Sequence, residues 1–431
     1  MGVFKYSPVD FLFTCVGLVF LLLDIVLDIF AAVSFYQEKA YVCLFILVLF
    51  LVGSSVLVQA FSWLWYSYEN FNRETKVEKC LSLSQLKLLH VLQLGIYFRH
   101  AGVVEISVCS FFSEHQTPED FAVYLSHDLS MLRLIETFSE STPQLVLMLT
   151  IILQRGQLDP VTVLKAVGSA SAIAFSVTTY HRSLRSFLPN KEKQQMSSSV
   201  VYFFWNLFVI LSRLTALALF ASVLPCYIFT HFFCSWMVLF FFVWRSKTEF
   251  MDSPSGEWLY RATVGLIWYF DWFNVGDGRT RYRTLLYHGY ILADISFLCS
   301  LWCWKMSTEI QQCHAIFIAA SVVAVYLLGL LLKMIYYMCY HPKLSKGELK
   351  GDSTEMFLTG QGPTRSQMFS GDVTVFAMSL SGDVVDNIPQ SLLTNDDTDT
   401  DVTDRSLPSP PAPDIKRCNK RMRKLAENFY S

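Results

Sequence analysis

The sequence predicts an all-α polytopic membrane protein with about eight transmembrane helices and two re-entrant or partial helices. Its composition is the first reason: 53% of the 431 residues are hydrophobic, only 16% are charged, and 36 are Phe. A water-soluble core of this length does not need so much apolar surface. The second reason is a series of apolar segments near the roughly 20 residues that a spanning helix requires. Lipid is therefore the expected solvent.

Ten apolar segments reach that length, at about 9–37, 41–66, 85–111, 119–153, 161–179, 200–224, 225–248, 257–275, 286–304 and 314–340. If all ten crossed with the N-terminus inside, the basic loops His181–Lys193 and Arg279–Arg283 would face outward. That arrangement opposes the excess of Lys and Arg found in cytoplasmic loops. Making the third and eighth segments re-entrant puts the basic loops, and both termini, on the cytoplasmic side.

The third and eighth segments are chosen because of what they contain. The third carries Arg99 and His100 near its middle, whereas the fourth is long enough to span with tilt. Both chosen segments also hold a similar stretch, Gly95–Phe98 and Gly265–Phe270, which suggests an internal repeat. A match this short also arises by chance. The first segment is too long for a removable signal and is expected to remain as a signal anchor.

The composition divides the chain into three parts. Residues 1–342 form the expected transmembrane domain, and residues 343–415 are rich in Ser, Thr, Asp, Gly and Pro. Such a stretch buries too little apolar area to fold, so a disordered cytoplasmic tail is expected. Residues 416–431 combine basic residues with Met422, Leu425 and Phe429 at helical spacing. This end predicts a basic amphipathic helix.

Several function classes find no support. The sequence has no zinc-type Cys/His spacing, phosphate-binding loop, nucleophile elbow or kinase motif, so no enzymatic activity, cofactor or metal is expected. A net charge of −2 offers no basic field for nucleic acid. Most of the 11 Cys lie in apolar runs and are interpreted as packing residues. No N-glycosylation sequon is present.

Ionisable residues inside the apolar segments are the unusual feature. Each costs about 2.5–3.5 kcal/mol at the bilayer centre, so such residues persist when they are paired, hydrated or functional. Asp24 and Asp28 lie four apart in the first segment and share a helical face. Asp10, fourteen residues before Asp24, returns to nearly the same direction. One stripe of the first helix is predicted to be acidic.

The fourth segment carries a second stripe. Arg133, Glu136 and Glu140 fall at i, i+3 and i+7, again on one helical face. Pro143 follows them and frees backbone carbonyls that polar neighbours or water must satisfy. Later segments carry single ionisable residues, namely Arg213, Asp294 and Lys333.

Two interpretations of these charges stay open at this point. They can be buried ion pairs that fix the register of packed helices. They can also form a hydrophilic track along which a polar or charged group crosses the membrane, and both can hold at once. Channels, proton-coupled transporters and lipid scramblases all need polar residues at depth, and periodicity does not choose among them.

The sequence resembles the XK-related family of membrane proteins across residues 8–342. The motifs that carry the likeness occur in order along the chain: Phe61–Trp65, Asp128–Leu134, Glu136–Phe138, Pro143–Leu145, Tyr180–Arg185, Glu257–Arg261, and Tyr336–Tyr337 up to His341–Pro342. It is most similar to the apoptosis-activated branch, whose members are phospholipid scramblases of the plasma membrane.

The resemblance implies ATP-independent lipid movement that exposes phosphatidylserine as an engulfment signal. It also implies a single-span glycoprotein partner of the basigin or neuroplastin type. By motif match, the residues of the lipid path are Asp10, Asp24, Asp28, Arg133, Glu136, Glu140, Arg182, Arg213 and Asp294. One position departs from the family: relatives have an acidic residue where this chain has Thr179. Either a carboxylate from another helix pairs with Arg182, or Arg182 reaches the interface.

The tail contains a candidate protease site. Asp383–Asp386, followed by Asn387, matches the Asp-x-x-Asp that effector caspases cut after, and it lies in a segment expected to be accessible. Acidic tails produce this pattern by chance, but the resemblance implies a site at this place. We expect the terminal helix around Met422, Leu425 and Phe429 to hold the path shut until cleavage releases it. Alternatively, its basic residues attract anionic inner-leaflet lipid.

The leading hypothesis is thus a scramblase in which headgroups slide along a charged groove while acyl tails remain in the bilayer. Asp24 and Asp28 would favour cationic amines, and Arg133 and Arg213 would favour phosphates. A secondary transporter of a small polar solute is the main alternative. A non-transporting adaptor whose charges are purely structural is the third.

Overall fold

The computed structural model describes residues 8–68, 75–112, 119–156, 160–186, 194–246, 248, 250–275, 281–306 and 309–340. Within these residues, side chains are described except at 111–122, 124, 160–165, 186, 281 and 309–313. All regular structure in the described part of the chain is helical, and no strand occurs there. The predicted all-α polytopic membrane fold is confirmed.

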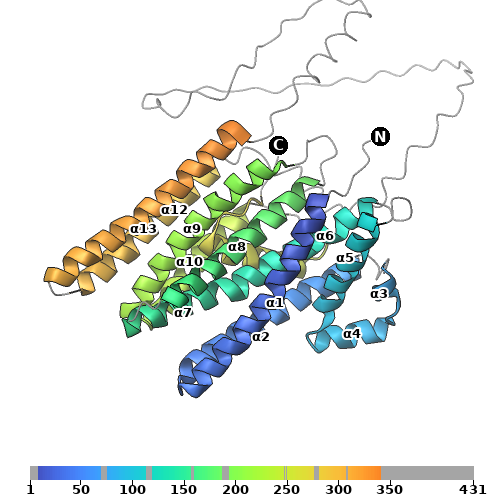
Figure 1. Cartoon of the computed structure of the whole chain (residues 1–431), viewed down its shortest axis with the longest axis horizontal. Coiled ribbons are helices and arrows are strands. Elements are labelled where there is room, and N and C mark those ends of the chain that lie inside the picture. Colours follow the sequence, from blue (N-terminus) through green and yellow to red (C-terminus); the bar gives the residue numbers. More distant parts are fainter. Residues whose placement is uncertain are drawn as a thin grey trace, which may run out of the picture. The chain divides into compact units, whose positions relative to one another are not determined.

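The helices follow the predicted segments closely (Figure 1). Their bounds are α1 (Pro8–Gln37), α2 (Tyr41–Tyr68), α3 (Lys76–Lys79), α4 (Leu83–Val91), α5 (Gly95–Phe112), α6 (Glu119–Glu136), the π-turn η1 (Thr137–Ser141), α7 (Thr142–Arg155), α8 (Pro160–Ser186), α9 (Met196–Val223), α10 (Tyr227–Arg245), α11 (Pro254–Phe270), α12 (Arg281–Lys305), α13 (Glu309–Ile335) and η2 (Tyr336–Tyr340).

Within the described residues, six helices are long and apolar enough to cross a membrane: α1, α2, α9, α10, α12 and α13. They differ in what surrounds them. In the apolar stretch of α1 only 6% of the residues are buried, whereas 67% are buried in that of α9. Helix α9 is the central helix of the fold, because α7, α8, α12 and α13 all pack against it. Helix α1 is exposed along most of its length.

The third predicted segment is two helices rather than one. Helix α4 begins with a capping box between Ser82 and Gln85 and ends at Val91, and α5 starts at Gly95. Between them, Gln93 adopts the left-handed backbone conformation, with φ of 64°. Gly95 lets the His90 ring approach, since a Cβ there would lie 2.6 Å from it. A helix, a sharp turn and a second helix agree with the re-entrant character predicted for this segment.

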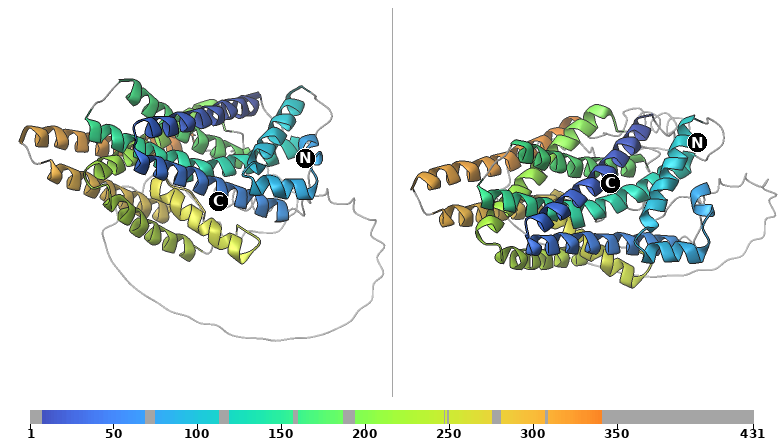
Figure 2. Two further views of the ribbon diagram at one scale, coloured as in Figure 1. Left: turned by 90° about the horizontal axis from the view of Figure 1, so that it is seen from below. Right: turned by 60° about the horizontal axis from the view of Figure 1, so that its bottom comes forward.

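The eighth predicted segment is the short helix α11, which lies alongside α10 (Figure 2). Ser253 caps its N-terminus by accepting a hydrogen bond from the Gly256 backbone N–H, and Pro254 occupies the first turn. Gly265 allows close packing, because a Cβ there would lie 3.3 Å from the Phe240 backbone. Most of the second half of α11 is buried in protein. It is a core element of the membrane domain.

The fourth predicted segment contains the π-turn η1 between α6 and α7. The turn ends immediately before Thr142 and Pro143, where the sequence predicted freed carbonyls. The Thr142 hydroxyl donates to the Thr137 carbonyl at 2.8 Å, and the Thr137 hydroxyl donates to the Arg133 carbonyl at 2.7 Å. Threonine side chains therefore satisfy part of the interrupted backbone. Such π-bulges are frequent at functional sites, and Glu140 lies within this one.

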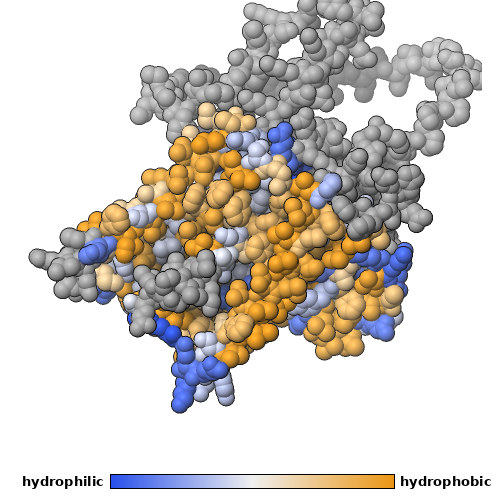
Figure 3. Space-filling model, viewed as in Figure 1, coloured by the Kyte–Doolittle hydropathy of each residue, from blue (hydrophilic) through white to orange (hydrophobic). Residues whose placement is uncertain are grey.

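The surface of the helical body is apolar along its flanks. In the view of Figure 3, hydrophobic side chains cover the lengths of the helices and hydrophilic ones gather near their ends. Large apolar side chains are extensively exposed, among them Phe30, Val42 and Phe317 at 68%, 73% and 75%. An apolar surface this extensive is unsuited to water and marks the lipid-facing part of the protein.

Candidate functional site

Two cavities lie along the inward side of α1. The first, here called the arginine cavity, has a volume of about 100 Å³ and is walled by α1, α5, α6 and α8. The second, here called the carboxylate cavity, has a volume of about 230 Å³ and is walled by α1, α2, α5, the turn before α5, α6 and η1. Together they contain most of the ionisable residues that the sequence singled out.

The arginine cavity is lined by Asp10, Arg133 and Arg182. The Arg182 guanidinium lies 3.2 Å from Asp10 Oδ1 and donates to the Ser199 hydroxyl at 2.7 Å. The counter-ion of Arg182 therefore comes from another helix, the first of the two alternatives that Thr179 raised. Thr179 itself donates a hydrogen bond to the Phe175 carbonyl within its own helix.

The carboxylate cavity is lined by Asp24, Asp28, Glu136 and Glu140. Arg133, which borders the arginine cavity, lies 2.7 Å from Glu136 and 4.0 Å from Asp24. One guanidinium thus serves two carboxylates. Within the described part of the chain, no Lys, Arg or His side chain lies within 4.0 Å of the other two, Asp28 and Glu140.

Neutral side chains complete the environment of the cavity. The Ser141 hydroxyl donates to Asp24 at 3.1 Å, and the Gln144 amide donates to Asp28 at 2.7 Å. Ser141 is the last residue of η1 and Gln144 lies in the first turn of α7, so η1 and α7 hold the two aspartates of α1 in place. Without a compensating charge, a buried carboxylate is costly. Asp28 and Glu140 face the same small cavity, so a proton or a cation there would offset the repulsion between their charges.

The two stripes predicted from helical spacing are present. Helix α1 turns Asp10, Asp24 and Asp28 toward the interior, where they line the two cavities. The π-turn carries Glu140 round to the same cavity as Glu136. Seven of the nine residues assigned to a lipid path from the sequence therefore gather beside α1: Asp10, Asp24, Asp28, Arg133, Glu136, Glu140 and Arg182.

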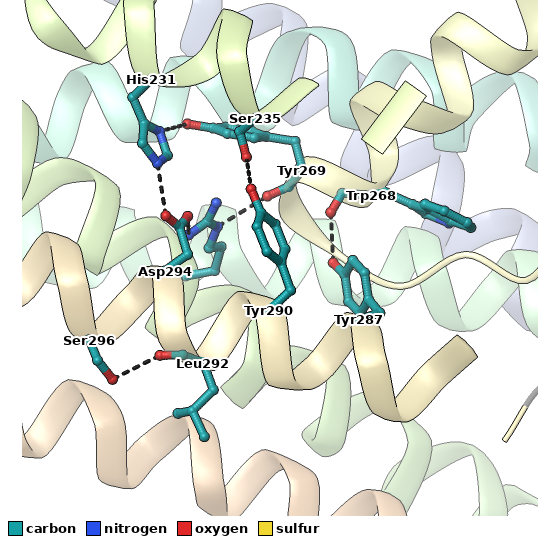
Figure 4. A network of polar contacts seen from close by, with 10 residues as sticks. His231, Ser235, Trp268, Tyr269, Tyr287, Tyr290, Leu292, Asp294 and Ser296 are labelled. Atoms are coloured by element: carbon teal, nitrogen blue, oxygen red, sulfur yellow. Dashed lines mark hydrogen bonds and ion pairs between the residues drawn. The ribbon is translucent and has the colours of Figure 1, made fainter. Parts of the chain in front are cut away.

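Arg213 and Asp294 lie in a different cluster and line neither cavity. Arg213, which is fully buried, donates to Asp294 at 2.6 Å and to the Tyr269 backbone carbonyl at 3.1 Å. His231 lies 3.0 Å from Asp294 and 3.0 Å from the Tyr269 hydroxyl (Figure 4). This cluster, the arginine–aspartate cluster, ties α9, α10, α11 and α12 together.

A further buried network holds the α4–α5 region against the rest of the fold. Arg99 donates to the Ser62 hydroxyl at 2.8 Å and lies 3.8 Å from Asp128. Its guanidinium also stacks over the Tyr66 ring at 3.8 Å. Arg99, one of the residues on which the prediction of a re-entrant segment rested, therefore has its polar and ring partners in α2 and α6.

Sequence reasoning missed several polar residues that the structure places at these sites. Gln59 and Gln93 line the carboxylate cavity, and His231 completes the arginine–aspartate cluster. Each is a polar residue within an otherwise apolar run, and this was the sequence signal that could have identified them.

The remaining residues singled out from the sequence lie away from the two cavities or outside the described residues. Lys333, noted in the last segment, lies 2.7 Å from His288 Nε2. The predicted caspase site, Asp383, Asp386 and Asn387, and the terminal residues Met422, Leu425 and Phe429 lie outside the described residues.

Comparison with known proteins agrees with this fold. The family model described as XK-related protein matches residues 12–342. A protein named XK-related protein 8 from Tetraodon nigroviridis is 44% identical over 349 residues, covering 80% of this chain and 86% of its own length. The protein of the same name from Gasterosteus aculeatus is 44% identical over 348 residues, covering 79% and 86%. That from Pan troglodytes is 36% identical over 339 residues, covering 77% and 84%. The chain belongs to the XK-related family.

Proposed function

We propose that this protein is an ATP-independent phospholipid scramblase, a multi-pass protein of the plasma membrane that moves lipids in both directions. One observation carries the proposal: α1 is exposed to lipid along most of its length, yet its inward side is lined by charged cavities. A lipid lying along α1 has a polar surface for its headgroup and an apolar surface for its acyl chains. No bond is made or broken.

The barrier to lipid crossing is the loss of headgroup hydration in hydrocarbon. Carboxylates, guanidinium groups and trapped water in the two cavities replace that hydration, as polar groups do in a pore. The exposed apolar residues of α1, such as Leu22, Val26 and Phe30, leave the acyl chains in contact with lipid. We place the path at the seven residues beside α1 and assign Arg213 and Asp294 a structural role next to it.

Regulation follows from the family resemblance. In our proposal, effector caspase cuts after Asp386, and the removal of residues 387–431 opens the path and exposes phosphatidylserine on apoptotic cells. A single-span glycoprotein of the basigin or neuroplastin type would deliver the protein to the surface, with both termini in the cytoplasm. Deletion of residues 387–431 should give lipid exposure without a death stimulus. Unchanged surface lipid, with the protein at the plasma membrane, would contradict this latch.

Reconstitution tests the main proposal directly. Purified protein truncated after Asp386 is placed in liposomes with acyl-labelled lipid in both leaflets, and an impermeant reductant is added outside. Scrambling predicts bleaching beyond the outer-leaflet fraction, whereas full-length protein should leave the inner leaflet protected. The carboxylate cavity would equally suit a transporter of a small cationic solute. Uptake of radiolabelled choline without any lipid movement would support that alternative and reject scrambling.

A further inference from the structure

We propose that the carboxylate cavity is a binding station for the cationic amine of a lipid headgroup, and that Gln59 is one of its ligands. The inference rests on the proposed scramblase function and adds the chemistry that the path selects. It predicts that lipids with an amine in the headgroup move faster than lipids without one.

The first argument is charge. Four carboxylates line the cavity, and in the part of the chain that the structure describes only one guanidinium pairs with any of them: that of Arg133, which Asp24 and Glu136 share. Asp28 and Glu140 line the same cavity, and in the described part of the chain neither takes part in a salt bridge; the Gln144 amide donates to Asp28. Paired carboxylates in a poorly hydrated site require a proton or a cation. An alkylammonium group supplies that cation.

The second argument is an unpartnered amide in the same cavity. Gln59 is only 4% exposed, yet among the described residues neither its side-chain oxygen nor its side-chain nitrogen has a hydrogen-bond partner. A buried polar group left in this state destabilises the fold. The other two glutamines nearby are satisfied: Gln93 accepts from Ser55 at 2.8 Å, and Gln144 donates to Asp28. Gln59 therefore offers an unused acceptor at the cavity wall.

The chemistry of the site favours an amine over the other charged groups of a lipid. A phosphate would be repelled by the four carboxylates. Among the described residues, no group of three or more His, Cys, Asp or Glu side chains is placed to hold a metal ion. The two arginines, Arg133 and Arg182, line the neighbouring arginine cavity. A zwitterionic headgroup with its amine among the carboxylates can therefore direct its phosphate toward Arg133.

Gln59 also predicts a difference among amines. A primary ammonium has three N–H donors, whereas the quaternary ammonium of choline has none. The Gln59 carbonyl can therefore accept a hydrogen bond from the ethanolamine or serine headgroup but not from choline. A hydrogen bond to a charged group is stronger than one between neutral groups. Loss of this acceptor should slow ethanolamine and serine lipids more than choline lipids.

The test uses the full-length chain, reconstituted in liposomes and treated with effector caspase. Trace acyl-labelled phosphatidylserine and phosphatidylglycerol form a matched pair, because both carry a net charge of −1 and only the first has an amine. The expected result is that phosphatidylserine moves about tenfold faster, which corresponds to about 1.4 kcal/mol. Equal rates would overturn the inference and leave scrambling intact, whereas no movement of either lipid would reject the proposed function.

Two substitutions examine the residues themselves. Gln59→Leu should slow phosphatidylethanolamine and phosphatidylserine about tenfold while phosphatidylcholine changes little. Gln154→Leu is the matched control, because Gln154 is exposed and lies outside the cavity. Glu140→Gln should reduce the preference for phosphatidylserine over phosphatidylglycerol. If both cavity variants fold, as judged by monodisperse size-exclusion profiles, and keep wild-type preferences, the site does not bind amines. The comparison of wild-type lipid rates stands even if either variant fails to fold.

Discussion

Two sets of charged residues at membrane depth differ in how they are paired. In the carboxylate cavity, Asp24 is 24% exposed and Glu136 20% exposed, and these two carboxylates share Arg133. Among the described residues, no salt bridge reaches the other two carboxylates of the cavity, Asp28 and Glu140. In the arginine–aspartate cluster, Arg213 is 0% exposed and meets Asp294 directly, and His231 occupies the second oxygen of Asp294. The same residue types therefore serve two purposes. A closed, matched pair fixes helix packing, whereas an open, unmatched group leaves room for a ligand.

The largest effect should come from breaking the closed pair. Arg213→Leu leaves Asp294 with a buried charge and without its guanidinium, so the protein should lose about 3–5 kcal/mol of stability. Thermal unfolding of detergent-purified protein would measure the loss. The double variant Arg213→Leu/Asp294→Leu removes both charges and should recover most of it.

The double variant also tests the comparison itself. Because the cluster lines neither cavity, a folded double variant should keep the lipid flux of the wild type. A stable double variant without flux would return Arg213 and Asp294 to the lipid path, where the sequence first placed them.

Neutralising the carboxylates of the carboxylate cavity should reduce lipid flux and leave stability intact, the opposite of what is expected for the arginine–aspartate cluster. With Asp24→Asn, Asp28→Asn and Glu140→Gln combined, stability should stay equal or rise, because like charges in a small cavity repel each other. Lipid flux of the caspase-cleaved protein should fall at least about tenfold, since the polar surface beside α1 loses its charges. The liposome assay measures this, with Glu105→Gln as a control, because Glu105 is a carboxylate of α5 that lines neither cavity. Unchanged flux in the triple variant would show that the path lies elsewhere.

Much of the fold followed from the sequence, because each part depends on local pattern. Most of the apolar segments match a helix to within several residues, and Pro143 marks the place where the regular backbone hydrogen bonding of the fourth segment is interrupted. Spacing on one helix predicts which side chains share a face, as for Asp24 and Asp28. These features need no knowledge of neighbouring helices.

The pairing between helices could not be predicted in the same way. Asp10 meets Arg182 across 172 positions of sequence, and Arg213 meets Asp294 across 81. Helical spacing does not say which helix faces which, so both pairs were assigned to one path although only one of them borders the cavities. The unpartnered state of Gln59 is likewise a property of the packed structure. Charge matching, the feature that separates the two regions, is visible only after folding.

A smaller effect is expected at the pair between α1 and α8. Asp10→Asn weakens the contact with Arg182 but leaves its hydrogen bond to Ser199, so flux should fall only a few-fold. Thr179→Glu places a carboxylate one helical turn from Arg182 on the wall of the same cavity and should restore flux in the Asp10→Asn background. Restoration would confirm that the source of the counter-ion is interchangeable. A double variant as impaired as Asp10→Asn would show that position, and not charge, matters there.

The smallest effect should come from the exposed pair at the far end of α1. A hydrogen bond from Arg155 lowers the pKa of Glu38 below its ordinary value. Because the folded-state pKa is depressed, the stability it adds is present above the unfolded pKa and is lost as pH falls through the folded pKa. Both side chains are in water, so the contribution should stay below about 1 kcal/mol. Glu38→Gln should therefore slightly reduce the dependence of the melting temperature on pH below about pH 5. Lipid flux should remain unchanged. A loss comparable to that of Arg213→Leu would contradict the view that solvation decides how much each pair stabilises.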